Sequence, residues 1–149
     1  MNRFDIHIQT LPKAEQLNTF KFMSFGFNPP VAVRSFQMLI NIWLKCFLTP
    51  KGSDPTNLKY GTNFTRLIGS NVTPRDARDV IIIAIEDCNN QIKTIQARDT
   101  TLSITERLLS ATLVEFSIDN TAPGVNAKVE LKNVANQRLL LNLPDFATV

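Results

Sequence analysis

The residues whose types could do chemistry together are acidic side chains in the middle of the chain. Cleavage of a glycosidic bond needs two carboxylates facing each other across the substrate, one of them with a raised pKa. The candidate pairs are Glu86 with Asp87, and Glu106 with Asp76 or Asp54. Glu86 and Asp87 are neighbours on a predicted helix and therefore point in different directions. Nothing in the sequence assembles the other pairs, so we interpret these acids as solvated charges and helix caps.

The other residue types that support catalysis or ligand binding are isolated. His7 is the single histidine and has no nucleophile organised around it, so we interpret it as a surface residue. Cys46 and Cys88 lack the C-x-x-C spacing of zinc and redox sites, and we expect both to lie on apolar helix faces; whether they ever pair stays open. The segment 51–53, Lys-Gly-Ser, lacks the spacing of a phosphate-binding loop. We therefore predict no cofactor and no metal.

Length and composition favour one globular domain. A chain of 149 residues can bury about 70% of its unfolded surface. The net charge of +3 is small and dispersed, which argues against a nucleic-acid partner. The N-terminus lacks the pattern of a signal peptide, and the apolar runs are too short to cross a membrane. We expect a protein that is made in the cytosol and binds neither membranes nor nucleic acid.

The apolar stretch between Asn28 and Pro55 predicts a buried helix. Pro29 and Pro30 fit a first helical turn, and Pro50 stops the helix after about Leu48. Apolar residues recur at three- and four-residue steps, which places them on one face. These residues are Val33, Phe36, Ile40, Trp43 and Phe47.

A long polar segment, 49–73, separates this helix from a second one. A loop of this length is uncommon in a compact domain and is usually functional or interface-forming. The second helix is predicted to begin with Thr73 as its cap, Pro74 at its first position and Asp76 in its first turn, and to end near Gln96. Its polar residues are expected on the solvated side: Glu86, Asp87, Asn89, Asn90 and Lys93.

Strands are predicted at both ends of the chain. Residues 4–8 alternate between apolar and polar types, and the Phe-rich segment 20–27 is either a partner strand or a patch that docks on another protein. Three further strands, 113–119, 125–132 and 139–143, follow one another with short connections, which predicts an antiparallel meander. The expected fold is α+β: two main helices packed on a small antiparallel C-terminal β-meander, with an N-terminal β-rich extension. We divide the chain into that extension, 1–29, and a domain, 30–149.

Several short motifs, in this order, resemble a known family. They are the segment 49–55 (TPKGSDP), 60–62 (YGT), 67–69 (LIG), the helix from Pro74, and 106–108 (ERL) leading into the meander. Over about residues 30–144 the chain is similar to the sheath-initiator or baseplate wedge proteins of contractile phage tails, which are also described as lysozyme-like and have a counterpart in the type VI secretion baseplate. The Glu-Pro-Arg motif of that family falls at 105–107, where this chain has no proline between Glu106 and Arg107.

The resemblance implies a structural role without enzymatic activity. A protein of this family would lie in the virion, in the tail baseplate, as part of a multi-copy ring. It would surround the tail tube protein, connect baseplate wedge proteins to the tail, and template the first ring of the tail sheath protein through its C-terminal strands. The candidate interface residues are Phe36, Ile40, Trp43 and Phe47 on the first helix, Glu106 and Arg107, and Leu139, Leu141 and Leu143 on the last strand.

Two other functions stay open at this stage. The lysozyme-like description of the family suggests an enzyme that cleaves peptidoglycan, which would need a deep cleft with two facing carboxylates. A generic adaptor protein is the other alternative, with the Phe-rich segment 20–27 as its binding arm.

Overall fold

The computed structural model describes residues 35–67, 70, 72–119 and 124–143. The strand expected at 4–8, the Phe-rich segment 20–27 and the two prolines before the first helix lie outside the described residues. The elements, in chain order, are the helix α1 (Ser35–Leu48), a 3-10 helix η1 (Phe64–Leu67), the helix α2 (Pro74–Ala97), and the strands β1 (Leu108–Asp119), β2 (Gly124–Asn133) and β3 (Arg138–Asn142).

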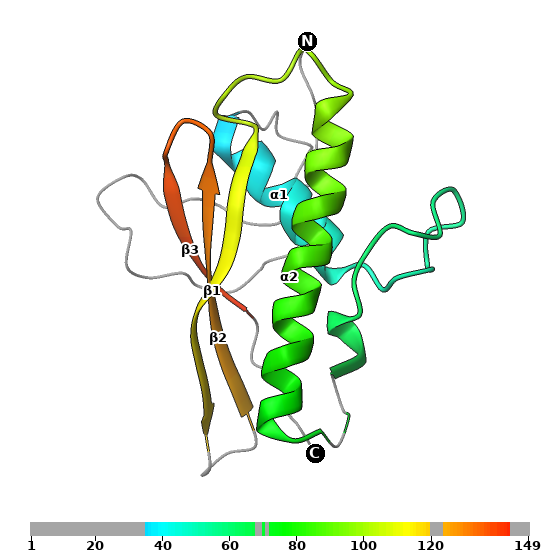
Figure 1. Ribbon diagram of the computed structural model, residues 1–149, viewed down its shortest axis with the longest axis vertical. Coiled ribbons are helices and arrows are strands. Elements are labelled where there is room, and N and C mark those ends of the chain that lie inside the picture. Colours follow the sequence, from blue (N-terminus) through cyan, green and yellow to red (C-terminus); the bar gives the residue numbers. More distant parts are fainter. Residues whose placement is uncertain (1–34, 68–69, 71, 120–123, 144–149) are drawn as a thin grey trace, which may run out of the picture.

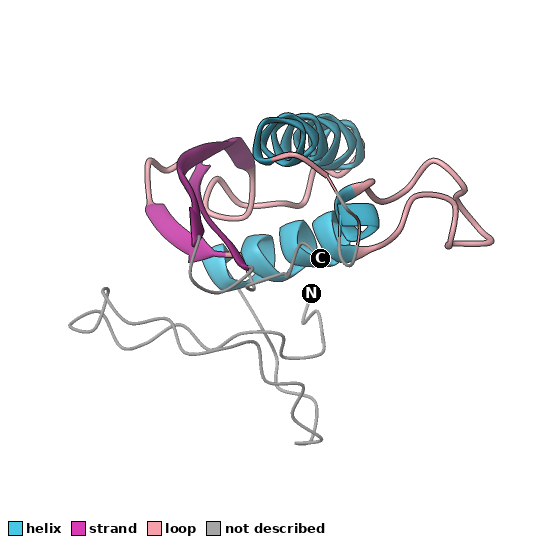
Figure 2. Ribbon diagram, turned by 90° about the horizontal axis from the view of Figure 1, so that it is seen from below, coloured by secondary structure: helices cyan, strands magenta, loops and turns pink. Residues whose placement is uncertain are grey.

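The three strands form one antiparallel sheet in the order β1-β2-β3, as the meander prediction required. α2 runs beside β1, and α1 crosses α2 and reaches β2, so both helices lie against the sheet (Figure 1). Seen along the long axis, the helices and the curled sheet enclose a common interior (Figure 2). The described residues therefore form an α+β fold.

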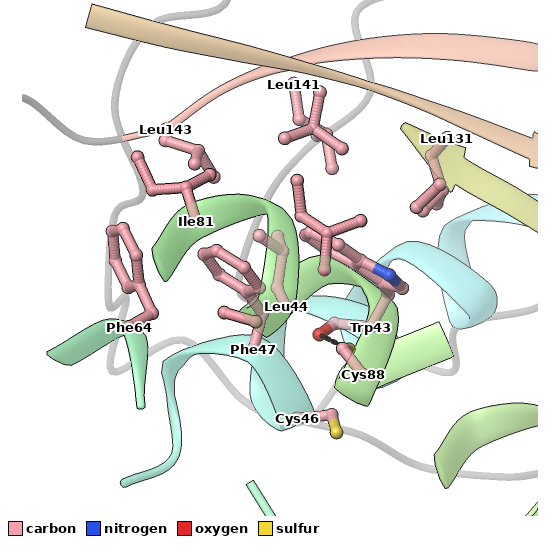
Figure 3. Packing of buried hydrophobic residues seen from close by; sticks show 14 of the residues in the cluster. Trp43, Leu44, Cys46, Phe47, Phe64, Ile81, Cys88, Leu131, Leu141 and Leu143 are labelled. Atoms are coloured by element: carbon pink, nitrogen blue, oxygen red, sulfur yellow. Dashed lines mark hydrogen bonds between the residues drawn. The ribbon is translucent and has the colours of Figure 1, made fainter. Parts of the chain in front are cut away.

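One hydrophobic core joins all of these elements. Trp43 and Phe47 of α1 are fully buried and stack with ring centroids 4.8 Å apart, and Phe64 of η1 lies 4.5 Å from Phe47. The sheet closes the core with alternate residues of β2 and β3, including Leu131 and Leu141 (Figure 3). Burying side chains of this size stabilises the fold by about 1.5–3 kcal/mol each.

α2 begins where the sequence predicted. Thr73 has extended backbone angles, and its hydroxyl accepts a hydrogen bond from the Asp76 backbone N–H at 3.2 Å. Pro74 occupies the first helical position, where a missing N–H costs nothing. The helix ends at Ala97, one residue beyond the predicted end.

β1 begins at Leu108, five residues before the predicted start at Leu113. It carries two register shifts, because Leu109 and Val114 are extra residues with no partner in β2. Each shift places two apolar residues next to each other, which breaks the period-two pattern on which a strand prediction depends. Both extra side chains are exposed, with 41% of Leu109 and 59% of Val114 accessible to solvent.

Asn89 corrects the prediction for the polar side of α2. It was expected in solvent, yet it is half-buried between helix and sheet. Its Oδ1 accepts from the Trp43 indole N–H at 3.3 Å, and its Nδ2 donates to the Ala111 carbonyl at 2.9 Å. A side chain that links α1, α2 and β1 in this way satisfies polar groups that burial would otherwise leave unpaired.

Candidate functional site

The outer edge of β3 is the first feature that could serve a partner. In the β2–β3 ladder, Leu143 donates to the Ala127 carbonyl at 2.9 Å and Asn133 donates to the Gln137 carbonyl at 3.1 Å. Bonded and non-bonded pairs alternate along an antiparallel ladder, so the odd-numbered residues of β3 bond to β2. The backbone N–H and C=O groups of Arg138, Leu140 and Asn142 consequently point away from the sheet.

The opposite strand, β1, is bonded to side chains of α2 over its first residues, at Leu108 and Ala111. Gln96 of α2 accepts from the Leu108 N–H at 2.8 Å and donates to the Glu106 carbonyl at 2.8 Å. Asn89 donates to the Ala111 carbonyl. Edge groups already bonded to a helix are not available to another strand. Within the described part of the chain, the outward backbone groups of β3 have no such helix partner, which makes β3 the clearer candidate for strand addition.

The apolar interface candidates lie in the core of the chain. Trp43, Phe47 and Ile40 are 0% exposed and Phe36 is 9% exposed. Leu139, Leu141 and Leu143 are between 2% and 4% exposed. These side chains pack inside the folded monomer, so they would serve an interface by holding the edge and surface of the sheet in place rather than by touching a partner.

Glu106 and Arg107 form hydrogen bonds within the chain. The Glu106 carboxylate accepts from the backbone N–H and the hydroxyl of Ser103, at 3.1 and 3.0 Å, and from the backbone N–H of Ser35 at 3.3 Å. Arg107 donates to the carbonyls of Leu102 at 3.3 Å and Asp99 at 3.1 Å. A carboxylate at the first residue of α1 also suits the positive end of the helix dipole. Together the two residues fix the turn between α2 and β1 to the start of α1.

The long loop after α1 is fastened to the body at its base. Gly61 and the Gln91 side chain exchange two hydrogen bonds, of 3.0 and 2.9 Å. The Thr62 hydroxyl donates to the Phe47 carbonyl at 2.6 Å, and Lys51 donates its backbone N–H to the Thr62 carbonyl at 3.0 Å. Between these anchors the loop projects from the body (Figure 1). Its tip is ordered by local bonds, such as those from Thr56 to Asp54, which lower the pKa of the Asp54 carboxyl.

The other acidic candidates have structural partners or lie in solvent. Asp87 forms an exposed ion pair with Lys51 at 3.1 Å, a contact worth at most about 1 kcal/mol. Asp76 accepts from the Thr73 hydroxyl at 2.6 Å at the start of α2, and Glu86 is exposed on the same helix. Their described contacts are those of caps and surface charges.

Two buried cysteines lie in the core where α1 crosses α2. Both are free and fully buried, Cys46 on α1 and Cys88 on α2. The neighbouring Cys88 thiol lowers the pKa of Cys46, whereas burial raises the pKa of Cys88. Burial also raises the pKa of Tyr60. Within the ranges that the structure describes, no cluster of three or more metal-ligating side chains occurs.

Sequence reasoning missed the polar residues that organise this region. Gln96 lies four positions after Ile92 on the buried stripe of α2, and a polar residue on an apolar stripe is a recognisable signal for an internal bond. Gln91 and Asn89 fall beside that stripe, where no periodicity distinguishes them from surface residues.

Comparisons with known proteins add no identification. No protein-family model matches this sequence, and a search of curated proteins found no match. Among the described residues, no helix has both the length and the apolar character needed to cross a membrane.

Proposed function

We propose that this chain is a structural protein of a contractile phage tail baseplate. In this role it takes its place in a multi-copy ring around the tail tube protein, connects baseplate wedge proteins to the tail, and templates the first ring of the tail sheath protein. The partners follow from the family resemblance of residues 30–144. The observation that carries the proposal is the outer edge of β3, which pairs with no other strand among the described residues, because templating by strand addition requires such an edge.

The geometry of β3 suits a strand acceptor. Arg138, Leu140 and Asn142 direct their backbone groups outward, and alternate residues between them are fixed in the core. The edge is therefore held rigidly, and an incoming strand would meet backbone donors and acceptors already in position. Preorganisation of this kind lowers the entropic cost of binding.

Side chains on the outer face of the sheet would set the specificity. Leu140 is 46% exposed and is an apolar residue among polar neighbours such as Glu130 and Arg138. An incoming strand would place its own side chains beside these residues. Cross-strand pairs of this type contribute about 0.2–1 kcal/mol each, which distinguishes a correct partner strand from an incorrect one.

The decisive experiment is a proline substitution at Leu140. Proline removes a backbone N–H that faces outward, so the Leu140→Pro protein keeps its own ladder while losing a donor for an added strand. We expect it to remain folded by circular dichroism and to nucleate the tail sheath protein of the same phage at least about tenfold less efficiently in a co-assembly assay followed by sedimentation.

Two matched variants separate loss of the outward N–H from loss of the side chain and from loss of the fold. Leu140→Ala removes the same side chain but keeps the N–H, and we expect it to support sheath assembly. Leu141→Pro removes an N–H that bonds to β2, and we expect it to weaken the fold itself. A Leu140→Pro protein that nucleates sheath as well as the unchanged chain would refute strand addition at β3.

A further inference from the structure

The two buried thiols lie where α1 crosses α2. The Cys88 thiol donates to the Trp43 carbonyl at 3.5 Å, and Trp43 is one turn before Cys46. The Cys46 thiol donates to the Gln91 side chain at 3.7 Å, and Gln91 is one turn after Cys88. Each sulfur therefore bonds to the opposite helix one turn away from the other cysteine, and Figure 3 shows the bond from Cys88 to Trp43.

We propose that Cys46 and Cys88 are an oxidation site that forms a disulfide joining α1 to α2. Because each thiol bonds across the crossing within one turn of the other cysteine, the crossing sets the two cysteines opposite each other, as an S–S bond of about 2 Å requires. This inference does not depend on the baseplate function, because it rests on the helix crossing alone.

The oxidant is a peroxide, which oxidises the two thiols in two steps. The Cys46 thiolate attacks one peroxide oxygen, the O–O bond breaks, and Cys46 becomes a sulfenic acid as the first water leaves. The sulfur of Cys88 then attacks the sulfenic sulfur, the S–S bond forms and the second water leaves. Two thiols and one hydrogen peroxide thus give one disulfide and two waters.

Access to the pair is controlled by the base of the long loop. Gly61 is held in place by its two hydrogen bonds with Gln91, and the same Gln91 side chain accepts from the Cys46 thiol at 3.7 Å. Both cysteines are 0% exposed while this contact is closed. Oxidation therefore requires local opening of the loop base, and its rate reports how often the loop base opens.

The test treats the full chain with hydrogen peroxide and measures its intact mass without reductant. We expect a loss of two hydrogens per monomer, a peptide map that joins the Cys46 and Cys88 peptides, and a Tm higher by about 5–15 °C that returns to its initial value with dithiothreitol. Persistent oxygen addition at one cysteine, or only disulfide-linked dimers, in a protein that stays folded would overturn the proposal.

Three variants sharpen the test. Cys46→Ala and Cys88→Ala each remove one thiol, and neither should show the mass loss or the reversible rise in Tm. Gln91→Ala frees the loop base and should form the disulfide about tenfold faster. An equal rate in Gln91→Ala and the unchanged chain would contradict control by the loop base, and a crosslink in either cysteine variant would contradict the assigned pair.

Discussion

At the scale of single residues, Gly61 is the position whose replacement has the clearest consequence. Its φ of +95° lies in the left-handed region, and a Cβ placed there would overlap the carbonyl oxygen of Thr49. That carbonyl accepts a hydrogen bond from Thr62 at 2.9 Å, so it is not free to move aside. The close approach of these two backbone segments is what places Gly61 against Gln91 and Cys46.

We predict that Gly61→Ala lowers the free energy of unfolding by about 3–4 kcal/mol, as measured by urea denaturation. Gly52→Ala is the matched control, because Gly52 also has a positive φ, +87°, but its nearest neighbour would lie 4.0 Å from the new Cβ. We expect the control to cost only about 1–2 kcal/mol. Equal losses in the two variants would show that the overlap with Thr49 is relieved at no cost.

Residues that act within their own segment were the predictable ones. Thr73 and Pro74 mark the start of α2 because capping depends on a few consecutive positions. The roles of Asn89 and Gln91 depend on groups far away in sequence, such as the Ala111 carbonyl, and no local pattern specifies them, whereas the place of Gln96 on the apolar stripe signals an internal bond without naming its partner. Glu106 and Arg107 were singled out as an acid and an arginine at the entry to a strand, able to form charge-assisted bonds within the chain or across an interface, but their bonds to Ser103, Ser35, Leu102 and Asp99 required the structure.

At the scale of elements, β1 shows where period-based prediction fails. The strand was predicted from Leu113 because the alternation before that residue is interrupted at Leu109, and the inner-face residue Ala111 is too small to signal burial strongly. β2 has no extra residue and was predicted to within one residue at each end. A bulge thus keeps a strand in the sheet while hiding it from a pattern of strict alternation.

We predict that deletion of Val114 is tolerated, with a change in the free energy of unfolding below about 2 kcal/mol. Without Val114, Leu113 and Phe116 still face the core, because only the unpaired residue is lost. Deletion of Lys128 from β2 is the control, since it shifts one half of a regular strand to the opposite face and should prevent folding. Circular dichroism and thermal unfolding compare the two, and similar damage from both deletions would contradict this account of the bulge.

At the scale of the whole molecule, the α+β class and the strand order followed from the sequence. Short connections between consecutive strands allow few sheet topologies. Each of the two helices has an apolar stripe that must be buried, and the sheet offers one surface on which both can pack. The sequence could not show which edge of the sheet bonds to α2 and which has no partner among the described residues. That outcome depends on the path of α2 along β1, which brings Gln96 to Leu108 and Asn89 to Ala111. The proposed site therefore needed the tertiary structure.

The position of Trp43 has an optical consequence. It is the single tryptophan of the chain, it is 0% exposed, and its indole touches α2 through Asn89 while it stacks on Phe47. Its fluorescence therefore reports the packing of both helices against the sheet at once. We predict that unfolding in urea shifts the Trp43 emission to longer wavelength with the same midpoint as the far-ultraviolet circular dichroism. Separate midpoints would mean that the helices part before the sheet melts. One intrinsic fluorophore thus makes the cooperativity of the fold measurable without a label.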